Sequence, residues 1–164
     1  MKARLWIVCV LLTALAGCGH REVFPVEPRI EFVRIDKIDE GTGIDNQANL
    51  VIYFEDGDGD IGLDETDKDS IYNIGSMYYY NFFINFYEKQ NGVWTEVELP
   101  MPLHARLPHL SDNVPESIKG EITITTFINN YTSPYDTIML SCQLVDRALH
   151  ESNVVTTPEI IVKK

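Results

Sequence analysis

Alternating aspartates and glycines form the segment of this chain that is best suited to bind a cation. Asp56, Asp58 and Asp60 occupy every second position, with a glycine between each pair. Hard cations such as calcium take about six to eight oxygen ligands, and carboxylates supply them. Glycine lets the backbone curl so that alternate side chains turn toward one centre. Because these charges would repel one another without a cation, the segment predicts a calcium-binding loop.

The segment differs from the calcium loop of an EF-hand. Counted from Asp56, the sixth position is Ile61 rather than glycine, and Gly62 follows one place later. The twelfth position is Asp67 instead of the expected glutamate. Magnesium is less favoured because it keeps several waters and needs fewer carboxylates. The alternative to a metal site is a solvated acidic turn in which the glycines serve only the backbone.

The elements around this loop have the pattern of β-strands. Leu50, Ile52 and Phe54 recur with a period of two, so they share one face of a strand. Asn91-Gly92 predicts a hairpin turn, and Pro158 indicates an edge strand or a bulge in the last run. The predicted strands cover 30–35, 49–55, 80–86, 93–97, 121–128, 137–145 and 154–162.

About seven short strands with turns between them predict an all-β domain over residues 29–164. We expect a two-sheet antiparallel sandwich of the immunoglobulin-like or fibronectin type III-like kind, with a small barrel as the second choice. The Cys…Trp…Cys signature of antibody domains is absent.

A second acidic segment lies between the last two predicted strands. In an immunoglobulin-like sandwich the loop after the second strand and the loop before the last lie at the same end. Asp146 could then complete the cation shell, with Asn153 nearby. Alternatively, Arg147 neutralises the aspartates by ion pairing and no metal is needed. The predicted metal ligands are Asp56, Asp58, Asp60, Asp64 and Asp146.

The first residues carry the features of a secretory signal. Lys2 and Arg4 precede an apolar run over residues 5–15, which is shorter than the roughly 20 residues that a membrane span needs. Leu15-Ala16-Gly17-Cys18 resembles the cleavage site of bacterial lipoproteins, and the resemblance implies cleavage before Cys18 and acylation of that cysteine. We therefore expect a signal peptide over 1–17 and a lipidated tether over 18–28. Of the two membranes of such a cell, we expect the outer one rather than the inner one to hold the anchor.

Composition limits the partners of the mature chain. The formal net charge is −12, and loss of residues 1–17 removes two further positive charges, so the chain repels nucleic acid and anionic headgroups. The lipid must therefore hold it to the bilayer. Cys142 is the one remaining free cysteine, which excludes an internal disulfide. Its position in a strand pattern predicts a core residue rather than a catalytic thiol.

Other candidate sites have weaker support. His104 and His109 lack further ligands at suitable spacing for zinc, so we expect surface histidines. The hypothesis of a hydrolase would rest only on the acidic cluster, because the chain has no Gly-x-Ser-x-Gly elbow.

The aromatic run over 78–87 could stack on sugars. Ser70, in Asp69-Ser70-Ile71, is a possible O-glycosylation site.

Several short motifs recur together in a known group of proteins. The runs DGDGDIG, RLP, GEI, YDTI and DRALHESN resemble, in similar order, those of small lipoproteins of Gram-negative bacteria. The last run is similar to the D-R-A-G-N-x-S-N ending of bacterial immunoglobulin-like domains. This chain has Leu149-His150 where Gly-Asn is usual, which argues against a tight glycine turn there. The resemblance implies an immunoglobulin-like sandwich on a lipid tether.

Taken together, these features predict a calcium-stabilised lipoprotein without enzymatic activity. It would act in the cell envelope as an adhesion, assembly or binding module and present its ion-binding loops away from the membrane. The alternative is a carbohydrate-binding accessory lipoprotein of an outer-membrane glycan-uptake system.

Overall fold

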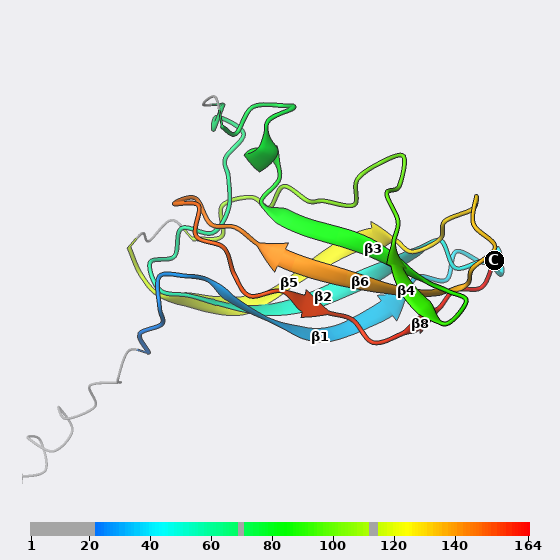
Figure 1. Ribbon diagram of the computed structural model, residues 1–164. Helices are drawn as coiled ribbons and strands as arrows, with labels where there is room; N and C mark the ends of the chain where they lie inside the picture. The colour runs from blue at the N-terminus through cyan, green and yellow to red at the C-terminus, as the bar shows by residue number, and fades with distance from the viewer. Residues whose placement is uncertain (1–21, 69–70, 112–114) are drawn as a thin grey trace, which may run out of the picture.

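The computed structural model describes residues 22–68, 71–111 and 115–164 (Figure 1). The lipidation site Cys18 and the possible glycosylation site Ser70 lie outside these residues. Within them the chain forms two layers of antiparallel strands and one short 3-10 turn over Met77–Tyr79. The predicted all-β, two-sheet antiparallel sandwich is confirmed. No helix in the described part of the chain is long and apolar enough to cross a membrane.

The strands divide between a three-stranded and a five-stranded sheet. The first sheet has the order β1-β2-β5, and all of its pairs are antiparallel. The second has the order β4-β3-β6-β7, and β8 also pairs with β6. The strands are β1 (Arg29–Lys37), β2 (Gln47–Asp56), β3 (Phe82–Gln90), β4 (Val93–Glu96), β5 (Ile118–Phe127), β6 (Thr137–Leu144), β7 (Val155–Thr156) and β8 (Ile160–Ile161).

The core lies between the inward faces of the two sheets. Leu50 and Ile52 on β2 stand opposite Ile124 and Ile122 on β5, and all four side chains are buried. Their alternation is the period of two that the sequence shows. Cys142 on β6 faces the same core and is 1% exposed, and burial raises the pKa of its thiol to about 12. It is therefore a small core residue, as predicted.

The last predicted strand is interrupted at its proline. β7 and β8 both pair with β6, but the residues between them leave the ladder. Pro158 has no amide hydrogen to donate, and the hydroxyl of Thr157 accepts a hydrogen bond from the amide of Leu140 at 3.1 Å. The side chain of Thr157 thus satisfies the backbone where the strand breaks.

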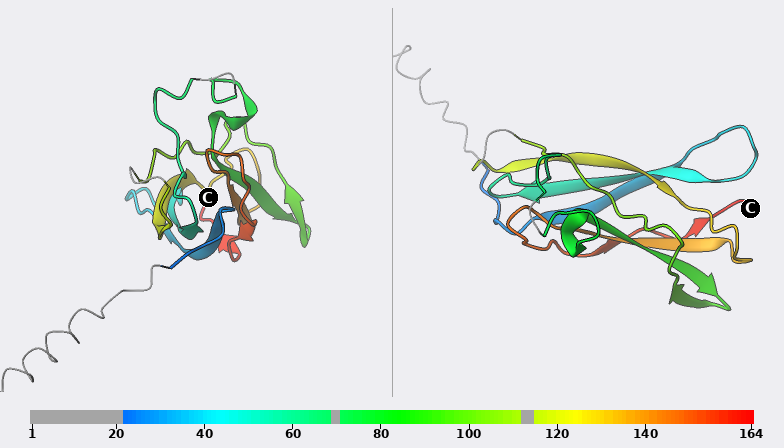
Figure 2. Two further views of the ribbon diagram at one scale, coloured as in Figure 1. Left: turned by 90° about the vertical axis from the view of Figure 1, so that its left-hand side faces the viewer. Right: turned by 90° about the horizontal axis from the view of Figure 1, so that it is seen from above.

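One end of the sandwich collects the ends of strands from both sheets. β2 ends at Asp56 and β6 ends at Leu144, and β1 begins there, opposite the end that carries the C-terminus (Figure 2). A bridge between Val145 and Glu151 closes the loop after β6. The two acidic segments are therefore neighbours in space, as the strand order predicts.

Candidate metal centre

Four aspartates from two loops converge at this end of the sandwich. Asp56 is the last residue of β2, Asp58 and Asp60 follow it, and Asp146 follows β6. Each contributes a carboxylate oxygen, and these four oxygens all lie within 4.8 Å of one another. Hard cations bind to oxygen clusters of this kind. The four aspartates thus form a group that could hold a metal ion.

Asp56 is the most deeply buried member of the group. Its side chain is 0% exposed, and neither of its carboxylate oxygens has a hydrogen-bond partner of normal geometry. One oxygen each of Asp58 and Asp60 is likewise buried without a partner. A buried carboxylate without a partner is costly. Asp56 contributes one of its two unpartnered oxygens to the cluster, so a cation bound there would satisfy it.

The electrostatics of the cluster favour binding of either a proton or a cation. Burial, together with repulsion from Asp58, Asp60 and Asp146, raises the pKa of Asp56 to about 7. Burial is also the largest cause of the raised pKa values of Asp60 and Asp146. Four ionised carboxylates at this spacing repel one another in a medium of low dielectric constant. A divalent cation would remove much of this repulsion.

Glycines allow the loop to pass close to other backbone segments. Gly59 has φ +74° and Gly62 has φ +110°, a region that favours glycine. A Cβ atom on Gly62 would lie 2.6 Å from the Cα atom of His109, and one on Gly59 would overlap the carbonyl oxygen of Glu116. The predicted role of the glycines in shaping the loop is confirmed at these two positions.

Backbone hydrogen bonds fix the loop to its surroundings. The amide of Leu63 donates to Leu107 at 3.0 Å, and the amide of Leu110 donates to Ile61 at 3.1 Å. Ser117 donates its hydroxyl to the carbonyl of Gly57 at 2.9 Å. Ile61 and Leu63 are also buried in the protein. Residues 61–63 are therefore held in place by contacts that do not involve the four carboxylates, whereas the cited contact at Gly57 is a single hydrogen bond.

His150 positions the carboxylate of Asp146. The backbone amide of His150 donates to one oxygen of Asp146 at 2.7 Å, and its Nδ1 lies 2.8 Å from the other. This contact raises the pKa of His150. Groups that hydrogen-bond to a metal-binding carboxylate orient it in this way. His150 is not among the candidate residues that the sequence predicts, although its spacing of four residues from Asp146 is visible there.

The turn before His150 is tight although it lacks glycine. Leu149 adopts φ +70°, and its amide donates to the carbonyl of Asp146 at 3.3 Å. Such a conformation is unusual for a residue with a branched side chain. The turn is therefore tight, but it is not the glycine turn of the similar proteins, because Leu149 adopts the left-handed conformation itself. The two hydrogen bonds from His150 to Asp146 supply a physical reason, because they hold the turn closed.

Asp64 does not belong to the group of four. Its carboxylate lies 3.7 Å from Arg147 and its side chain is 52% exposed. Arg147 also pairs with Asp67 at 2.5 Å. The cation of Arg147 thus contacts Asp64 and Asp67 rather than the four clustered aspartates, so the charge of the cluster is not neutralised by these ion pairs.

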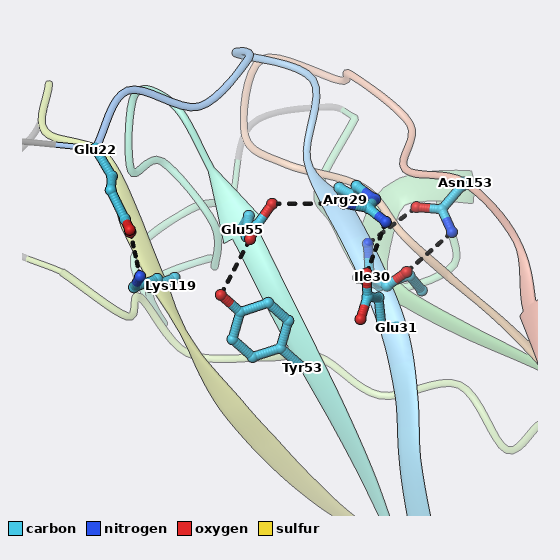
Figure 3. A network of polar contacts seen from close by, with 8 residues as sticks. All are labelled: Glu22, Arg29, Ile30, Glu31, Tyr53, Glu55, Lys119 and Asn153. Atoms are coloured by element: carbon cyan, nitrogen blue, oxygen red, sulfur yellow. Dashed lines mark hydrogen bonds and ion pairs between the residues drawn. The ribbon is translucent and has the colours of Figure 1, made fainter.

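Asn153 serves the edge of the first sheet instead of the cluster. Its side-chain amide donates to the carbonyl of Ile30 at 2.9 Å, and its oxygen accepts the amide of Ile30 at the same distance (Figure 3). The segment after the Asp146 loop is thereby joined to the first residues of β1. Asn153 holds the two sheets together beside the candidate site.

The histidine and aromatic candidates lie outside the cluster of four aspartates. Nδ1 of His104 accepts the amide of Ile84 at 3.1 Å, and its ring packs edge-on against Tyr80 and Phe83. Burial lowers the pKa of His104, so it is neutral and half-buried rather than a free surface histidine. Within residues 22–68, 71–111 and 115–164, the four aspartates are the group of side chains that could hold a metal ion.

The comparisons with known proteins add no assignment. No family model matches the chain, and no curated protein or solved structure matches it significantly. The chemistry of the site therefore rests on its own geometry, with Asp56 as its most informative residue.

Proposed function

We propose that this protein is a membrane-anchored lipoprotein whose β-sandwich is stabilised by calcium bound to Asp56, Asp58, Asp60 and Asp146. It serves the cell envelope as a non-enzymatic adhesion, assembly or binding module. The observation that carries the calcium site is Asp56, a fully buried carboxylate whose two oxygens lack partners within a ring of three further carboxylates.

The chemistry of the ligands supports calcium over other common ions. Four carboxylates and no nitrogen or sulfur atom make up the cluster, which is a donor set for hard cations. Magnesium dehydrates reluctantly and is bound through one or two carboxylates. Calcium accepts many carboxylate oxygens and tolerates irregular geometry, which suits four carboxylates that come from two different loops.

The lipid anchor is the second part of the proposal. It rests on Leu15-Ala16-Gly17-Cys18 and on the acidic charge of the chain. Acyl chains on Cys18 would hold the protein to a bilayer that its charge disfavours. Gly19 rather than aspartate follows the cysteine, which favours an outer-membrane location.

A structural role fits the cluster better than catalysis. A catalytic carboxylate must reach its substrate, whereas Asp56 is 0% exposed. Asp146 is 2% exposed and is already engaged by His150. A bound ion at this position would tie the ends of β2 and β6 together, and so join the two sheets.

Carbohydrate binding is the alternative function, and one surface favours it. Phe83 and Tyr87 alternate with buried residues on β3, and Trp94 on β4 is paired with Lys89, two residues after Tyr87. A cleft of about 550 Å³ next to β3 is lined in part by Asn85 and Glu96. Half-buried rings beside amide and carboxylate groups could stack on sugars and bind hydroxyls. If the protein binds none of the glycans on an array, with calcium present, this alternative is excluded.

Thermal unfolding tests the calcium site in the mature protein. Calcium at about 100 times its dissociation constant should raise the free energy of unfolding by about 2.7 kcal/mol, which for a domain of this size raises Tm by several degrees. Excess chelator should reverse the rise, and the same concentration of magnesium should not reproduce it. An identical Tm in calcium and in chelator would show that the aspartates hold no stabilising calcium.

A further inference from the structure

The segment that leads into the domain packs against the back of the aspartate loop. Gly57 lies between Asp56 and Asp58 in the sequence. A Cβ atom at Gly57 would lie 2.6 Å from the carbonyl carbon of Pro25 and closer still to the carbonyl oxygens of Phe24 and Pro25. The tether backbone therefore touches the loop at the residue between two of the proposed ligands.

A lysine on β5 holds the same segment from the other side. Lys119 forms an ion pair with Glu22 (Figure 3), and its ammonium group lies 5.7 Å from the centre of the Phe24 ring. Lys119 is paired with Glu55, the residue before Asp56, across the β2–β5 ladder. The tether is thus fixed at two places, one on the aspartate loop and one on the neighbouring strand.

The short link to the lipid places this contact near the membrane. Four residues lead from Cys18 to Glu22, and an extended chain of that length spans at most about 14 Å. With Cys18 acylated, the aspartate loop therefore faces the bilayer. This is opposite to the orientation expected from the sequence, in which the ion-binding loops lie away from the membrane. The sequence does not show that residues 24–25 fold back onto Gly57.

We propose that occupancy of the aspartate site by calcium controls whether tether residues 22–27 stay docked on the domain. This inference rests on the proposed calcium site and lipid anchor. Without the cation, repulsion among the carboxylates moves the backbone from Asp56 to Asp60. The backbone at Gly57 then leaves the position at which the carbonyl groups of Phe24 and Pro25 pack against it. The number of residues between the acylated cysteine and the fixed part of the domain grows from about four to about ten, so the domain moves more freely above the membrane.

A spin label at Val23 reports the state of the tether directly. The Val23 side chain is 84% exposed, so a nitroxide on Val23→Cys leaves the packing of Phe24 intact. Cys142 is buried and Cys18 is acylated in the mature protein, so the label has one accessible thiol. The lipidated protein is placed on phospholipid vesicles, and its spectrum is recorded with calcium, with magnesium and with chelator.

Calcium should restrict the motion of this label, and chelator should release it to the free nanosecond motion of an unstructured segment. The matched label Val93→Cys, on an exposed β4 residue at the far end, should give the same spectrum in all three conditions. Calcium binding is measured on the same samples by titration. If calcium binds and the mobility at position 23 does not change, the coupling is wrong while the calcium site stands. If calcium does not bind, the proposed function itself fails.

Two lysine substitutions separate docking from metal binding. Lys119→Gln removes the contacts with Glu22 and Phe24, so the label at position 23 should be mobile even with calcium bound. Lys89→Gln is the matched control, because Lys89 also pairs with a glutamate and lies 5.5 Å from an aromatic ring centre, that of Trp94. By linkage, Lys119→Gln should weaken calcium binding by the factor by which calcium favours docking, whereas Lys89→Gln should leave calcium affinity unchanged. A label that stays restricted in Lys119→Gln would overturn the proposed docking.

Discussion

Replacing Asp56 by asparagine should stabilise the protein in chelator and destabilise it in calcium. Without a cation the Asp56 carboxylate is buried, lacks partners and is repelled by its neighbours. The asparagine side chain has nearly the same shape and carries no charge, so this repulsion disappears. With calcium, the substitution removes a central ligand, and the stabilisation by the ion is lost.

The size of both effects follows from the pKa and from linkage. A pKa of about 7 in place of 3.8 corresponds to at most about 4 kcal/mol for the ionised carboxylate. A buried amide without partners costs about 1–3 kcal/mol in turn, so we expect a net gain of about 1–3 kcal/mol in chelator at pH 8. In calcium at about 1,000 times its dissociation constant, the unmodified protein gains about 4.1 kcal/mol that the variant lacks. After the gain from the lost repulsion is subtracted, Asp56→Asn should be less stable than the unmodified protein by about 1–3 kcal/mol.

Asp64→Asn is the matched control for this experiment. Asp64 lies in the same acidic segment, but its side chain is 52% exposed and faces Arg147. Its substitution should leave the calcium-dependent change in Tm intact. Urea unfolding of the three proteins in calcium and in chelator measures all of these free energies. If Asp56→Asn loses stability equally in both conditions, Asp56 has a packing role and is not a metal ligand.

The stability of the calcium-free protein should fall as pH rises from about 4 to about 7. The pKa of Asp56 is about 7 in the folded protein and 3.8 in the unfolded chain, so the folded state binds one more proton between these values. The contribution of the protonated carboxyl is fully present below pH 3.8 and is lost as pH passes through 7. The slope from this group is at most about 1.4 kcal/mol per pH unit. The raised pKa values of Asp60 and Asp146 act in the same direction.

Calcium should reverse the sign of this dependence. A bound cation requires ionised carboxylates, so stability in calcium rises over the same pH range. Asp56→Asn should flatten the calcium-free profile, because its side chain does not titrate. Denaturant unfolding at several pH values, in chelator and in calcium, gives both profiles. Parallel profiles in the two conditions would show that the aspartates titrate without a cation.

The strands and three of the clustered aspartates follow from local patterns in the sequence. Leu50, Ile52 and Phe54 alternate because one face of β2 meets the core, and this period is visible without any structure. The spacing of Asp56, Asp58 and Asp60 likewise predicts that their carboxylates point toward one centre. Placing Asp146 beside them requires the strand order as well, and the general topology of immunoglobulin-like sandwiches supplies it.

The remaining features depend on contacts between distant segments, which local patterns do not contain. Asp64 lies in the same acidic run as the ligands but turns to Arg147, because the loop leaves the site after Gly62. The docking of Phe24 on Gly57 joins residues more than 30 positions apart. Loops take their path from such packing rather than from residue propensity.

The most direct test of the central claim is calorimetric titration of the metal-free protein with calcium at pH 7.5. We expect one calcium ion per chain, no displacement by millimolar magnesium, and loss of the binding heat when Asp58→Asn is combined with Asp60→Asn. Asp64→Asn should titrate like the unmodified protein. Absence of binding heat in the unmodified protein, or an unchanged affinity in the double variant, would contradict the assignment of these four aspartates as a calcium site.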